Sequence, residues 1–160
     1  MEKLLSIYLN DHLAGSTSGI ELARRLARQQ AESRLGEPLG AVAKEIAEDR
    51  DDLLEMMHAL DITPRRAKVY AGWAAEKAGR LKLNGRVMNR SPLSFVLELE
   101  TLMLGVEGKQ ALWRTLRTLA EHEPRLDDER LARLEERAQR QHDALEELRS
   151  RSAGRILTTH

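Results

Sequence analysis

Apolar residues recur every three or four positions along almost the whole chain, and this period limits the fold more than any other feature of the sequence. The C-terminal part shows it clearly, at Leu126, Leu131, Leu134, Ala138, Leu145 and Leu148, with charged residues between them. Runs that alternate apolar and polar residues, which are typical of half-buried β-strands, do not occur. The sequence therefore predicts an all-α protein.

Prolines and capping residues divide this pattern into five predicted helices. The helices cover residues 3–34, 38–60, 64–83, 92–120 and 128–152. Thr63-Pro64 and Ser91-Pro92 each place a capping residue before a proline in the first turn of a helix. Residues 1–152 are long enough to form one helical-bundle domain with a single core, and residues 153–160 are expected to be a frayed tail. Residues 93–106 are apolar on nearly all sides, so we expect that helix to be the most buried.

The order and lengths of the helices suggest a topology. Two long helices form a hairpin, a connection with a shorter helix follows, and two more long helices complete the chain. One long crossover between two hairpins is how ferritin-like bundles are connected. The second helix also carries Glu55-x-x-His58, a motif that such bundles use to bind metal. By helix order and by this motif, the chain resembles the ferritin-like superfamily.

This resemblance implies an up-down four-helix bundle with a helical crossover, and a site for two iron or manganese ions. A second Glu-x-x-His is needed on the last helix, where this chain has Gln139-x-x-His142. In that topology His58 and His142 would also differ in level by roughly 15 Å, at about 1.5 Å per residue. We therefore expect no cofactor, with iron or manganese as the alternative. The segments 73–85 and 91–114 also resemble a group of bacterial helical proteins of uncharacterised function, which implies no activity.

Four polar residues fall on the apolar stripes, namely His12, Asp49, Glu100 and Glu107. A buried charge requires a partner, so the first interpretation is a polar layer that fixes the register of the helices. The alternative is a site for a single ion built from Asp49, Glu107 and His12. Together with Glu55 and His58, these three residues are the candidate metal ligands of the chain.

Glycine and small polar residues interrupt the first predicted helix at "AGSTSG", residues 14–19. The favoured interpretation is close approach of a neighbouring helix, and the alternative is a local break that lines a small cavity. The stretch "GVEGKQ", residues 105–110, lacks the spacing of a phosphate-binding loop and follows a predicted helix rather than a strand. No Ser-His-Asp arrangement can be recognised around the histidines.

Charge is balanced overall, with 26 basic and 26 acidic residues. It is unevenly placed, because the second helix is acidic whereas residues 63–90 hold a cluster of basic side chains. We expect this basic crossover to pack over the bundle beside acidic neighbours, and we consider nucleic-acid binding unlikely. The chain has no cysteine, which excludes disulfides and thiolate chemistry. No apolar run is long enough for a membrane span, and a cytoplasmic protein is expected.

These observations favour a non-catalytic, cytoplasmic helical-bundle protein that acts through a surface. We expect it to self-associate as a homodimer, since few aromatic residues are available for its core, and a different protein partner is left open. The alternative function is that of a ferritin-like metal-binding protein or di-metal oxidase.

Overall fold

The computed structural model describes residues 2–65 and 91–158, and this part of the chain is all-helical, without strands. Its helices are α1 (Glu2–Gln29), α2 (Gly36–Ala59), α4 (Pro92–Ala120) and α5 (Asp128–Leu157). The predicted helix over residues 64–83 and almost all of the basic crossover lie outside the described residues. Within the described ranges, none of the helices has the length and apolar character needed to cross a membrane.

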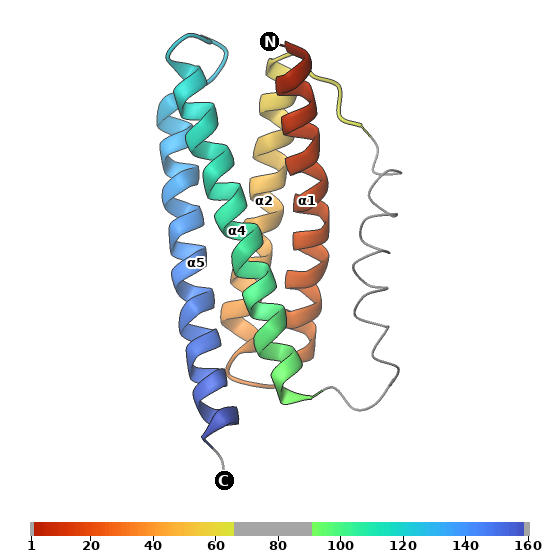
Figure 1. Cartoon of the computed structure of the whole chain (residues 1–160), viewed down its shortest axis with the longest axis vertical. Helices are drawn as coiled ribbons and strands as arrows, with labels where there is room; N and C mark the ends of the chain where they lie inside the picture. The colour runs from red at the N-terminus through yellow and green to blue at the C-terminus, as the bar shows by residue number, and fades with distance from the viewer. Residues whose placement is uncertain (1, 66–90, 159–160) are drawn as a thin grey trace.

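The four helices form a bundle of two hairpins (Figure 1). In one hairpin α1 packs against α2, and in the other α4 packs against α5. The two hairpin turns lie at opposite ends of the bundle, and α2 and α4 run in the same direction (Figure 1). Contacts between the hairpins, α1 with α4 and α2 with α5, are fewer than those within them.

Side-chain caps start the second hairpin where the sequence predicts. Ser91 Oγ accepts a hydrogen bond from the backbone N–H of Leu93 at 3.2 Å, and Asp127 Oδ1 accepts one from Arg130 N–H at 3.1 Å. Each cap satisfies an N–H group that the first helical turn leaves free. Two other ends differ clearly from the prediction, because α1 stops at Gln29 and α5 continues through the expected tail to Leu157.

The apolar stripe of α5 is buried as its spacing predicts, from Leu131 to Leu148. The prediction that α4 is the most buried helix, covered on nearly all sides, is wrong in part. Leu99 and Leu102 are buried, but Leu97 and Leu104 are 52% and 69% exposed. The described neighbours of α4 cover only its inner side, so an outward leucine face is left at the surface.

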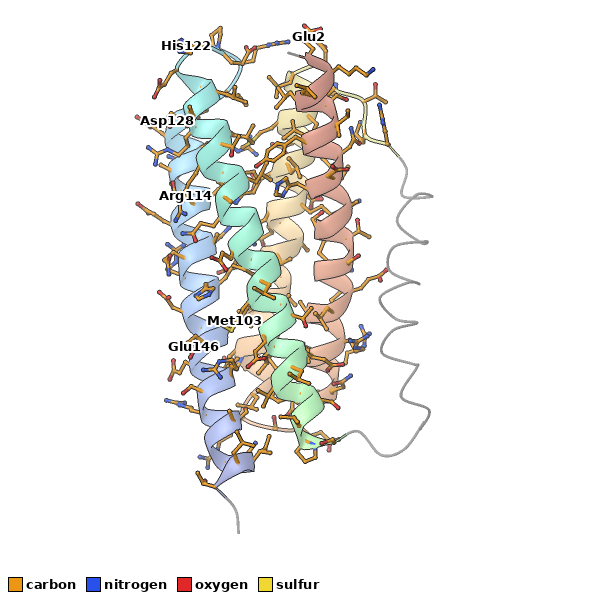
Figure 2. All side chains as sticks on the ribbon, viewed as in Figure 1. Glu2, Met103, Arg114, His122, Asp128 and Glu146 are labelled. Carbon is orange, nitrogen blue, oxygen red and sulfur yellow. The ribbon has the colours of Figure 1, made fainter. Side chains whose placement is uncertain are left out.

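Ion pairs join the two helices of the second hairpin along its edge. Arg117 Nε donates to Asp128 Oδ1 at 2.8 Å, and Arg114 Nε donates to Glu135 Oε1 at 2.8 Å. Figure 2 shows Arg114 on α4 and Asp128 on α5 in the half of the bundle near the turn that joins these helices. Pairs as exposed as these each contribute little to stability, so the apolar core must hold the hairpin together.

Candidate functional site

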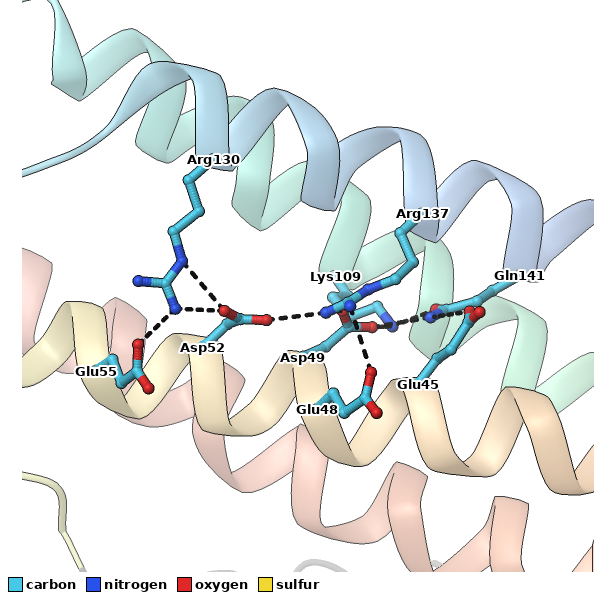
Figure 3. Close-up of polar contacts among 9 residues, drawn as sticks. All are labelled: Glu45, Glu48, Asp49, Asp52, Glu55, Lys109, Arg130, Arg137 and Gln141. Atoms are coloured by element: carbon cyan, nitrogen blue, oxygen red, sulfur yellow. Dashed lines mark hydrogen bonds and ion pairs between the residues drawn. The ribbon is translucent and has the colours of Figure 1, made fainter.

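A row of carboxylates on α2 faces α5 and is paired there with cations (Figure 3). Their spacing of three or four residues places them on one side of the helix. The row consists of Glu45, Glu48, Asp49, Asp52 and Glu55. Lys109 of α4 and Arg130 and Arg137 of α5 pair with the last four, and Glu45 accepts a hydrogen bond from Gln141. This ion-pair network lies between the two hairpins.

Asp49 is the buried centre of the network, with a relative exposure of 1%. Arg137 Nε donates to its Oδ1 at 2.7 Å, and Gln141 Nε2 donates to its Oδ2 at 3.0 Å. Lys109 Nζ also donates to Oδ2, as well as to Gln141 Oε1. Both oxygens of the buried carboxylate therefore have charged or polar partners, which a charge in this position requires.

The cations respond differently to burial. Burial lowers the pKa of Lys109 below its usual value, although the neighbouring Asp49 opposes this effect. Burial also acts to lower the pKa of Arg137, but Asp49 and Asp52 outweigh it and the pKa is raised. Arg137 thus stays charged throughout the usual pH range, and it provides the permanent positive charge beside Asp49.

The structure separates the five candidate metal ligands. Glu55 and His58 are exposed near the end of α2, and Glu55 Oε2 accepts a hydrogen bond from Arg130 Nη2 at 2.6 Å. Glu107 is also exposed, so it does not belong to a buried polar layer as predicted. Only His12 and Asp49 come together, on the wall of one cavity. Among the described residues, no three His, Asp or Glu side chains are grouped so that they could hold a metal ion.

The three residues that hold the carboxylate of Asp49, namely Lys109, Arg137 and Gln141, were not predicted to be part of a site. Gln141 stands in the apolar stripe of α5 between Ala138 and Leu145 and is only 1% exposed. Lys109 stands on the buried side of α4 between Val106 and Trp113. The signal for both is a polar residue at a position where the helical period requires an apolar one.

A cavity of about 460 Å³ lies between α1, α2 and α4. Its apolar wall comes from Ile46 and Leu53 on α2 and from Leu102, Val106 and Leu112 on α4. Cavities of this size and character are typical of sites for small organic molecules. The cavity adjoins the ion-pair network, because Asp49 and Lys109 line it as well.

Glycines on two facing helices form part of the cavity wall, Gly15 and Gly19 on α1 and Gly105 and Gly108 on α4. A Cβ atom placed on any of these four would meet nothing within 4 Å. The favoured interpretation of "AGSTSG", close approach of a neighbouring helix, is therefore wrong at Gly15 and Gly19. The alternative interpretation correctly predicts that this segment lines a cavity. The break in the helix that it also predicts does not occur, since α1 is helical throughout this segment. The missing side chains leave space between α1 and α4.

Two residues that line the cavity each have a buried nitrogen donor without an acceptor among the described residues. These donors are Nε of Arg50 on α2 and Nε1 of Trp113 on α4. Trp113 is fully buried, with 0% relative exposure. A buried donor without a partner costs about 1–3 kcal/mol, so this is an uncommon arrangement that requires an explanation.

The two hydroxyl groups of the wall have hydrogen-bond partners. Tyr8 Oη donates to Thr115 Oγ1 at 3.2 Å, and the ring of Tyr8 packs edge-on against His12, with centroids 4.6 Å apart. Burial lowers the pKa of His12, against the opposing effect of Asp11, so its imidazole is neutral near pH 7. The hydroxyl of Ser16 donates to the carbonyl of Leu13. It does not contact His12, so the two do not form a nucleophile and its base.

Comparison of the chain with family models, with curated proteins and with solved structures gives no match. The function is therefore argued from the cavity and the residues around it.

Proposed function

We propose that this protein is a non-catalytic helical bundle that binds a small, largely apolar molecule in the cavity between α1, α2 and α4. One observation carries the proposal: glycines of two facing helices widen the cavity instead of bringing the helices together. Glycine inside a helix costs about 1 kcal/mol relative to alanine, and no packing contact offsets that cost at these positions. A ligand that fills the space would account for it.

The proposal is tested with a neutral, apolar fluorescent dye, N-phenyl-1-naphthylamine. We expect the dye to bind the native chain with increased emission, because the apolar wall removes it from water. The double variant Gly19→Leu, Gly108→Leu places two side chains in the cavity and should abolish binding. The matched control is Gly154→Leu on α5, since a Cβ at Gly154 also meets nothing within 4 Å but this residue is exposed and away from the cavity.

Circular dichroism of each variant shows whether the bundle is retained. Equal binding by the filled variant and the native chain would contradict the proposal, as would no binding by the native chain. Loss of binding in the filled variant alone, with unchanged helical signal, would support it.

A second candidate function is self-association through the outer face of α4. Leu97 and Leu104 are exposed and lie seven residues apart, so both point outward from the same side of the helix. Leu93, 43% exposed, extends this face towards the start of α4. The partner would be a second copy of the chain, with the two α4 helices packed along their leucines. The double variant Leu97→Glu, Leu104→Lys should then sediment as a monomer at concentrations where the native chain is a dimer.

We also infer that the helices are connected as in ferritin-like bundles. The inference is supported by the positions of the described helices, because α2 ends at one end of the bundle and α4 begins at the other (Figure 1). A topology with one long crossover separates the end of the second helix from the start of the next bundle helix in this way. The connection does not itself imply a metal, and the five candidate ligands do not converge.

A further inference from the structure

We propose that the ligand of the cavity is a monocarboxylic acid with an apolar body, whose carboxylate pairs with Arg50. This inference rests on the proposed function and adds the chemical class of the ligand. It starts from the charges in the cavity wall, which come from Asp11, Asp49, Arg50 and Lys109.

Three of these four charges already have interactions within the protein. Asp49 is neutralised by Lys109 and Arg137, and Lys109 is paired in return. Asp11 is exposed and has an interaction of its own. Arg50 makes no ion pair with any described residue, and its Nε is buried without an acceptor. Arg50 is thus the one wall charge, among the described residues, for which a ligand could supply the counter-ion.

The position of Arg50 on α2 separates it from the acidic row of the same helix. Ile46 and Leu53, one turn before and after it, line the cavity with it. Asp52 faces α5 instead, where Arg130 and Arg137 pair with it. Asp49 also lines the cavity, but its charge is paired with Arg137 and Lys109. The acidic residues around Arg50 in sequence therefore have their own cations.

The guanidinium of Arg50 also determines the chemistry of the ligand group that it can hold. A guanidinium can only donate hydrogen bonds, so it complements a group that only accepts, and an ionised carboxylate is such a group. Arginine binds carboxylates with two parallel hydrogen bonds, which makes it well suited to this role. The remaining wall is apolar and would hold an alkyl or aromatic body.

The experiment compares octanoic acid with octan-1-ol, which have bodies of equal length and differ in charge. Binding of each to the native chain is measured by isothermal titration calorimetry below their aggregation limits. We expect the acid to bind roughly tenfold more tightly or better, as a charged hydrogen-bonded pair implies. Arg50→Met keeps an unbranched apolar side chain and should remove this preference while leaving the affinity for octan-1-ol nearly unchanged. Arg140→Met, at an exposed position on α5, is the control and should keep the preference.

Equal affinity for acid and alcohol in the native chain would overturn the assignment of Arg50, even if the dye still binds and the proposed function stands. Failure of the dye to bind would instead reject the function itself. If Arg50→Met does not fold, the salt dependence of binding to the native chain tests the proposal instead. Raising the ionic strength from about 0.05 M to about 0.5 M should weaken binding of the acid and not of the alcohol. An acid affinity that does not change with salt would then overturn the proposal.

Discussion

Arg137 Nε lies 2.7 Å from Asp49 Oδ1, a contact between residues 88 positions apart that joins α5 to α2. It lies between the two hairpins, where contacts between α2 and α5 are fewer than those within each hairpin. Lys109 of α4 donates to the same carboxylate, so Asp49 connects three of the four described helices. The register of one hairpin relative to the other therefore depends on this buried charge.

Replacing Asp49 by Asn should lower the free energy of unfolding by about 3–5 kcal/mol, because Arg137 and Lys109 would lose the carboxylate that compensates them. Urea denaturation followed by circular dichroism measures the change. The control is Asp51→Asn, a nearby exposed position on the same helix, which should stay within about 0.5 kcal/mol of the native chain. A similar small change for both variants would mean that the cations around Asp49 do not depend on it.

Much of the architecture could be predicted from the sequence, because the residues that determine it are local. Ser91 and Asp127 cap their helices as expected, and the leucine stripe of α5 has a single direction on the helix. The segment 93–106 is different, since apolar residues on all sides do not define an inner face. For that reason Glu107 was predicted to face inward, whereas Lys109 two residues later is the side chain that does so.

The candidate site was predicted less well, and the reasons are again physical. The spacing of Glu55-x-x-His58 places both residues on one side of a helix, as the metal motif requires. In this part of α2, however, both side chains are exposed. A glycine in a helix has the same sequence signal whether it admits a neighbouring helix or leaves an open space. Which of the two applies at Gly15 depends on the distance between α1 and α4. The two helices are far apart in the sequence, so no local pattern encodes that distance.

Alanine at the cavity glycines should stabilise the fold. Gly15→Ala and Gly105→Ala should each raise the free energy of unfolding by up to about 1 kcal/mol, because both residues are inside helices and the added Cβ meets no atom within 4 Å. Gly36→Ala is the matched comparison and should destabilise. Its Cβ would lie 2.5 Å from the carbonyl oxygen of Gln30, so the backbone of the turn must move. Urea denaturation of the three variants shows whether each substitution raises or lowers the free energy of unfolding. A loss of stability in Gly15→Ala would show that α1 and α4 lie closer together than in the structure.

Metal content tests the ferritin-like alternative directly. Protein purified without chelators should contain iron and manganese far below stoichiometric amounts, because Glu55 is paired with Arg130 and the described residues bring no third ligand to Glu55 and His58. Elemental analysis of the native chain and of Glu55→Ala and His58→Ala gives the answer. A stoichiometric metal that disappears in both variants would restore the di-metal interpretation.

Mild acid should destabilise the bundle through His12. Burial lowers the pKa of His12 in the folded chain, whereas the unfolded chain has a pKa of about 6.5. Below that value the unfolded state binds the proton more readily, so stability is greatest above about pH 6.5 and falls as the pH decreases. The charged groups that line the cavity together with His12 are Asp11, Asp49, Arg50 and Lys109.

The carboxylates with lowered pKa values, such as Glu123 at about 2, begin to affect stability at about pH 5, where their unfolded forms start to take up protons. Unfolding by urea is therefore measured at about pH 7, 6.5 and 5.5, where the loss of stability should come mainly from His12. His12→Gln should reduce that loss, and His122→Gln, at an exposed position in the turn before α5, should leave it unchanged. The same decline with pH in His12→Gln as in the native chain would show that this imidazole is not the group that titrates.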